Sequence, residues 1–166
     1  MIGGQMQILK ITQENASEAS HIYANSWKVA YKNIVPQEYL DQLSLERWTP
    51  FLRESPFMGF MLKINGEFVG TTSVAPARDK QMIGWGEVIS IYVSPEHFGK
   101  GYGKILFAHA IDALNEMGLN QIYLWVLEEN WQARVFYEHN GFWESGDKMT
   151  IKIGGKELVE VRYVNK

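Results

Sequence analysis

Cysteine is absent from the 166-residue sequence, which excludes disulfides, thiolate nucleophiles and thiolate metal ligands. The four histidines are scattered without a pair at ligand spacing such as HxH or HExxH, so we expect no metal. A basic excess is also lacking, because 16 Lys and Arg stand against 19 Asp and Glu, and this argues against nucleic acid as a partner. No run approaches the ~20 apolar residues of a membrane span, and the first residues show no signal-peptide pattern. These absences predict a soluble, cytoplasmic protein without a membrane partner.

Apolar residues make up 46% of the chain, which is enough for a buried core, and no repeat or linker interrupts it. We therefore expect a single domain over residues 1–166. Hydrophobic periodicity and turn residues predict strands at 6–11, 57–64, 67–76, 86–93 and 121–127 and a strand hairpin over 149–164. They predict helices at 14–32 and 36–43, a short one capped by Ser44, one from the glycines near 101 to Gly118, and one between Asn130 and Gly141. The fold class is α/β (α+β), with one mixed, mostly antiparallel, twisted sheet of about seven strands flanked by helices.

The stretch HFGKGYGK (97–104) places three glycines between a predicted strand and a predicted helix. A helix N-terminus has unpaired N–H groups and a partial positive charge, which suits a phosphate. Glycines allow positive φ and let the backbone approach the phosphate oxygens without a Cβ in the way. The spacing matches neither a Walker loop nor a dinucleotide fingerprint. A flexible surface turn is the alternative that the loop alone leaves open.

The run VISIYVSPEHFGKGYGKILF (88–107) resembles the acyl-CoA motif R/Q-x-x-G-x-G/A of the GNAT superfamily of N-acetyltransferases, with Phe98 in place of Arg or Gln. The segment NWQARVFYEHNGF (130–142) is similar to the part of that family that follows the fifth strand. The resemblance implies a GNAT-like fold and an enzyme that transfers acetyl from acetyl-CoA to a primary amine of a small molecule or peptide. It also implies a homodimer, because dimers are frequent in that superfamily.

The resemblance implies which residues hold acetyl-CoA. Backbone groups of one strand would bind the pantetheine arm, amides of the glycine loop the pyrophosphate, and one later helix the far side of the arm. In that order these residues are Ile91, Tyr92 and Val93; Phe98, Gly99, Lys100, Gly101, Tyr102, Gly103 and Lys104; and Asn130, Ala133 and Phe136. Core packing is the alternative for Ala133 and Phe136, and a solvated surface position is the one favoured for Lys100.

Acetyl transfer from a thioester to an amine needs a base, an oxyanion donor and an acid for the leaving thiolate. The resemblance implies Tyr137 as the acid, and a separation of seven residues returns Tyr137 to the helix face of Asn130. It implies Glu87 as the base, and strand alternation would place Glu87 on one face with Ile89 and other apolar residues, which suits a proton acceptor. The alternative for Tyr137 is simple packing. For Glu87 the alternatives are a structural carboxylate with a water chain as the base, or a β-bulge that upsets the alternation.

The family's acceptor cleft lies between the first helices and the last hairpin. The resemblance therefore implies Trp27, Tyr31 and Trp85 as acceptor-binding residues, with Tyr39 beside them. Aromatic residues at i and i+4 of a helix are as a rule core residues, which is the alternative here. An acyl-CoA sensor or a catalytically idle relative is the alternative function. A ligand-free interaction scaffold would leave the glycines unexplained.

Overall fold

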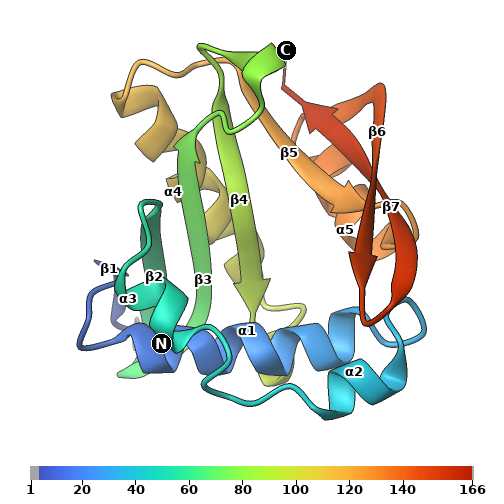
Figure 1. The fold of residues 1–166 in the computed structure, drawn as a ribbon. Helices are drawn as coiled ribbons and strands as arrows, with labels where there is room; N and C mark the ends of the chain where they lie inside the picture. The colour runs from blue at the N-terminus through green and yellow to red at the C-terminus, as the bar shows by residue number, and fades with distance from the viewer. Residues whose placement is uncertain (1–3, 166) are drawn as a thin grey trace.

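A computed structural model describes residues 4–165, in which helices pack around one sheet (Figure 1). The strands are β1 (Met6–Lys10), β2 (Met58–Ile64), β3 (Glu67–Pro76), β4 (Gly86–Val93), β5 (Ile122–Leu127), β6 (Trp143–Ile153) and β7 (Lys156–Val164). The α-helices are α1 (Ala16–Ala30), α2 (Gln37–Asp41), α3 (Thr49–Arg53), α4 (Tyr102–Glu116) and α5 (Trp131–His139), and two 3-10 helices are η1 (Lys80–Met82) and η2 (Pro95–His97). Within this part of the chain, none of the helices has the length and apolar character that spanning a membrane requires.

The strands form one seven-stranded sheet in the order β1-β2-β3-β4-β5-β7-β6. Every neighbouring pair is antiparallel except β4 and β5, which are parallel. The predicted mixed, mostly antiparallel sheet of about seven strands is therefore confirmed. The Asn65-Gly66 turn between β2 and β3 has φ of 50° and 85°, as the dipeptide predicted.

Helices cover both faces of the sheet, with α1 in front of β3 and β4 and α4 behind them (Figure 1). The α4 side holds the larger core, in which Phe107 and Leu114 pack against Val88 and Ile122. Gly70 lets α4 approach β3, because a Cβ there would lie 2.6 Å from Leu106 Cδ1. This close packing fixes the start of α4 next to the end of β4.

Two predicted boundaries were wrong. Ser44 does not cap the third helix, which begins at Thr49; the Ser44 hydroxyl instead accepts the Glu46 N–H at 3.1 Å within a turn. The last hairpin was predicted from residue 149, but β6 already begins at Trp143. Residues 143–150 are all exposed, and the pairing with β7 is irregular between Glu144 and Lys148, so no regular apolar pattern marks this part of the strand.

Strands β4 and β5 separate along their length, which creates the main opening in the sheet. Their pairing is limited to Gly86 with Ile122 and Glu87 with Tyr123. Beyond these pairs, no strand within residues 4–165 pairs with the edge of β4 that faces β5, although its other edge continues to pair with β3 as far as Val93. In Figure 1, the two strands lie together at one end and diverge toward the end where α1 crosses.

Candidate active site

A groove of about 710 Å³ lies where β4 and β5 diverge, and α1, α5 and the β6–β7 hairpin complete its walls. Most of the predicted site residues line it: Trp27, Tyr31, Ile91, Tyr92, Val93, Phe98, Gly99, Gly101, Tyr102, Gly103, Lys104, Asn130, Ala133, Phe136 and Tyr137. Trp85, Glu87 and Lys100 do not line it. Lys100 is exposed, and its Nζ lies 3.4 Å from Nδ1 of His97. The favoured expectation of a solvated Lys100 agrees with this position.

The glycine loop presents unpaired N–H groups at one end of the groove. Gly99 and Gly101 have φ of 78° and 82°, values that other L-residues rarely adopt. The first hydrogen bond of α4 runs from the Ile105 N–H to the Gly101 carbonyl at 3.4 Å. The amides of the first helical turn, from Tyr102 to Lys104, therefore have no partner within the helix. Together with the positive end of the helix dipole, these amides form a site for an anion.

Helix α5 lines the groove and packs in the same core as α4. Its first turn is held by Asn130, whose side-chain oxygen accepts the Ala133 N–H at 3.3 Å. Asn130 and Tyr137 both line the groove, as their spacing of seven residues predicted. Phe136 also lines it and makes an edge contact with Phe107, with ring centroids 5.7 Å apart, so Phe136 belongs to both the core and the groove.

Tyr137 brings a hydroxyl into this apolar surface. Its side chain is only 8% exposed, and its ring packs against Phe107 and Phe136 at 5.5 Å and 5.4 Å. Within residues 4–165 no group forms a hydrogen bond with its hydroxyl. Burial, and then the neighbouring Tyr92, raise the pKa of Tyr137 well above its ordinary value. The hydroxyl thus stays protonated at neutral pH and can donate to a group in the groove.

The opposite end of the groove is aromatic and lies between α1 and the last hairpin. Trp27 and Tyr31 meet edge to face, with ring centroids 4.8 Å apart, and both pack against the cluster that contains Leu127 and Leu158. The predicted role of Trp85 does not fit its position, because it precedes β4 at the end where β4 and β5 are still paired. Tyr39 also lies outside the groove and packs against Gly154.

Trp125 and Glu160 are among the groove residues that sequence reasoning missed. Trp125 lies in an apolar strand whose pattern predicts only core. For Glu160 a signal existed, because alternation along β7 places it on the same face as buried Leu158 and Arg162. A carboxylate at an inward-facing position is unusual enough to indicate a site.

Glu87 is held by a polar network beside the groove. Its carboxylate accepts the backbone N–H and the guanidinium of Arg78 and, at 2.7 Å, the hydroxyl of Tyr123. The expected apolar surroundings were wrong, because a bulge upsets the alternation: Ser73 pairs with Ser90 but Val74 pairs with Val88, which leaves Ile89 as the additional residue. Glu87 and Val88 are both buried.

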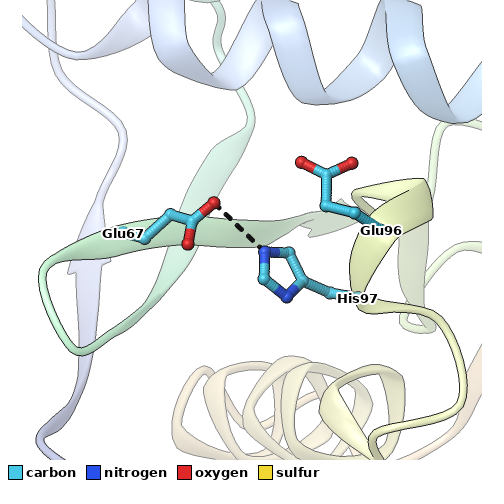
Figure 2. Close-up of side chains that lie close together, drawn as sticks. All are labelled: Glu67, Glu96 and His97. Atoms are coloured by element: carbon cyan, nitrogen blue, oxygen red, sulfur yellow. Dashed lines mark hydrogen bonds and ion pairs between the residues drawn. The ribbon is translucent and has the colours of Figure 1, made fainter.

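A second cluster of ionisable groups lies beside the glycine loop. Figure 2 shows Glu67, Glu96 and His97, whose candidate metal-ligand atoms lie within 4.8 Å of one another. His97 Nε2 lies 3.2 Å from Oε1 of Glu67, a contact that joins the start of β3 to the loop after β4. Both carboxylates are exposed. The expectation of a metal-free protein stays a prediction.

Comparisons with known proteins agree with this geometry. Residues 19–142 match the model of the acetyltransferase (GNAT) family. A spermidine N(1)-acetyltransferase of Thermoplasma acidophilum is 24% identical over 95% of this chain and 98% of its own. An uncharacterized N-acetyltransferase of Bacillus subtilis is 26% identical over 75% of this chain and 73% of its own.

Solved structures with the same fold include the PaiA N-acetyltransferase of Thermoplasma acidophilum in complex with coenzyme A. It superposes with a TM-score of 0.75 at 20% identity and covers 98% of this chain and 99% of its own. A GCN5-related N-acetyltransferase from Rhodopseudomonas palustris also has a TM-score of 0.75, at 16% identity, over 100% of this chain and 98% of its own. The sequence match and the shared fold lead to the same conclusion: this chain belongs to the acetyltransferase (GNAT) family.

Proposed function

We propose that the protein transfers an acetyl group from acetyl-CoA to a primary amine of a small molecule or peptide. The observation that supports this best is the continuity of the groove. It leads from the unpaired amides at the start of α4, along the free edge of β4, to the buried hydroxyl of Tyr137. One groove thus combines an anion site, a free strand edge and a proton donor, which suit the pyrophosphate, the amide-containing arm and the thioester of acetyl-CoA. The names of relatives such as the spermidine N(1)-acetyltransferase support an amine as the acceptor.

In this proposal the pantetheine arm lies along β4 like an additional strand. Backbone groups between Ile91 and Val93 bond to its amides, because β5 leaves that edge unpaired. The pyrophosphate lies on the amides of Gly99 and the first turn of α4, and Asn130, Ala133 and Phe136 cover the arm from α5. Lys104 lines the groove beside the pyrophosphate and adds positive charge there.

The chemistry is a direct attack. The amine nitrogen bonds to the thioester carbonyl carbon, a backbone N–H near Ile91 stabilises the oxyanion, and the C–S bond then breaks. The departing sulfur takes a proton from the Tyr137 hydroxyl. The proton that the amine nitrogen loses then returns the Tyr137 hydroxyl to its protonated form. Its raised pKa means that the Tyr137 hydroxyl is protonated at neutral pH, so the proton is in place when charge develops on the sulfur.

For the base, we propose a water chain instead of direct transfer to Glu87. The Glu87 side chain lies outside the groove, and both of its oxygens already accept hydrogen bonds from Arg78. In this proposal the carboxylate has a structural role. It accepts a hydrogen bond from Tyr123 and so joins β4 to β5 at the last residue pair before the two strands diverge.

Substitution of Glu87 distinguishes these two roles. We expect Glu87→Gln to lower the free energy of unfolding by about 1–3 kcal/mol, because hydrogen bonds to a buried charged group are lost. The dissociation constant of acetyl-CoA should not change. Thermal unfolding and calorimetry measure the two effects, with the exposed Glu157→Gln as a matched control. Full stability together with a lost acidic limb of the pH–rate profile would instead support Glu87 as the base.

An acceptor screen tests the proposed function. Free CoA release from acetyl-CoA is followed over amines, amino acids, polyamines, aminoglycosides and peptide N-termini, and mass spectrometry identifies the acetylated product. We expect release that depends on at least one primary amine. Tight acetyl-CoA binding without transfer to any of these amines would favour the alternative of an acyl-CoA sensor.

A further inference from the structure

One carboxylate in the groove has no role in the chemistry described above. Among the described residues that line the groove, Glu160 is the only acidic one, and it is half-buried on β7 opposite Leu127. Its carboxylate has no hydrogen-bond or ion-pair partner within residues 4–165. Burial raises the pKa of Glu160, with Glu87 adding to the rise and Arg78 opposing it. A bound cation would restore the interactions that the ionised carboxylate lacks.

The cations near Glu160 already have other partners. Arg162 lies on the same face of β7, but its guanidinium pairs with Asp79 and, at 2.9 Å, with Asp147, and it stacks on Trp125. Arg78 pairs with Glu87. Neither side chain donates to Glu160, so within residues 4–165 its carboxylate has no hydrogen-bond or ion-pair partner.

The surroundings of Glu160 suit an organic cation. Trp27 and Tyr31 line the same part of the groove, and rings of this kind attract an ammonium group through their faces. Burial keeps the pKa of Tyr31 high, so its hydroxyl contributes no competing charge. The basic side chains that line the groove, His97, Lys104 and His139, come from the glycine loop, α4 and α5 instead of the hairpin.

We infer that Glu160 binds a cationic group of the acceptor other than the amine that is acetylated. The reacting nitrogen must lose its proton and its charge before it attacks, so it cannot also supply a lasting ion pair. This inference rests on the proposed function and narrows it to small acceptors with a second positive charge, such as diamines and polyamines. Glu160 is then the residue that determines this specificity.

Equilibrium binding tests the inference without requiring turnover. Calorimetry on the protein saturated with CoA compares 1,4-diaminobutane, 4-amino-1-butanol and 4-aminobutanoate, which are similar in length and differ in the charge of one end. We expect the diamine to bind roughly 10-fold or more tightly than the alcohol, as one charge-assisted hydrogen bond provides, and the carboxylate to bind least. Glu160→Gln should remove this ranking, while Glu157→Gln, an exposed position of the same strand outside the groove, should retain it.

Equal affinity for the three compounds, or a ranking that survives in Glu160→Gln, would overturn the inference. Binding of acetyl-CoA to the variant with its normal affinity confirms that the variant is folded. Acetyl transfer is measured separately, so the two proposals can fail independently. Diamine selectivity without transfer would contradict the proposed acetyltransferase activity and support the role of Glu160. Transfer without a charge preference would support the activity and contradict the role of Glu160.

Discussion

Tyr137→Phe should lower kcat by about 10²–10⁴ while the affinity for acetyl-CoA changes little. The substitution removes only the hydroxyl, which has no hydrogen-bond partner within residues 4–165, so no internal bond is broken. The ring keeps its contacts with Phe107 and Phe136, and stability should therefore be nearly unchanged. Steady-state kinetics with a good amine acceptor and calorimetry with acetyl-CoA measure the two quantities.

Tyr39→Phe is the matched control, because it removes a phenol hydroxyl outside the groove. It should leave kcat at the parent value. If Tyr137→Phe also turns over at the parent rate, the departing sulfur receives its proton from another group, and Tyr137 only fills space in the core.

The second large effect is expected at the glycine loop. Gly101→Val should weaken acetyl-CoA binding by roughly 10–100-fold, the equivalent of one charge-assisted hydrogen bond to the pyrophosphate. At φ of 82° a β-branched residue is strained, so the backbone will move and the amides at the start of α4 will no longer converge on one point. Calorimetry of acetyl-CoA binding measures the loss.

Gly118→Val provides the comparison at the other end of the same helix. Gly118 has φ of 79°, and like Gly101 it has no heavy atom within 4 Å of an added Cβ. Both variants should lose similar stability, about 1–3 kcal/mol, from backbone strain alone. Only Gly101→Val should lose acetyl-CoA affinity, and an equal loss in both variants would argue that strain, and not the anion site, is responsible.

Local patterns were sufficient to predict most of the fold. The strand at 86–93 and the turn at Asn65-Gly66 depend on alternation and on positive φ, both of which short stretches of sequence reveal. Ser44 and the start of β6 could not be predicted in the same way. The first is one of several polar residues able to cap, and the second lies in an exposed strand that depends on pairing with β7.

The candidate site was predictable where it depends on one motif and less so where it depends on tertiary contacts. Gly101, Asn130 and Tyr137 lie where the two motifs place them. Gly101 and Asn130 begin helices α4 and α5, and Tyr137 lies on the side of α5 that faces the groove. The environment of Glu87 was mispredicted because one bulged residue shifts every later side chain of the strand. Glu160 faces the groove only because β7 pairs with β5, a contact between segments distant in sequence.

A crystal structure of the protein with CoA tests the proposed arrangement of the coenzyme and Tyr137 most directly. The expected result is the pyrophosphate on the amides of Gly99 and Tyr102 to Lys104, the arm along the free edge of β4, and the sulfur within hydrogen-bonding reach of the Tyr137 hydroxyl. CoA bound away from the glycine loop, or a sulfur that lies out of reach of Tyr137 in a fully occupied complex, would contradict the mechanism proposed for this protein.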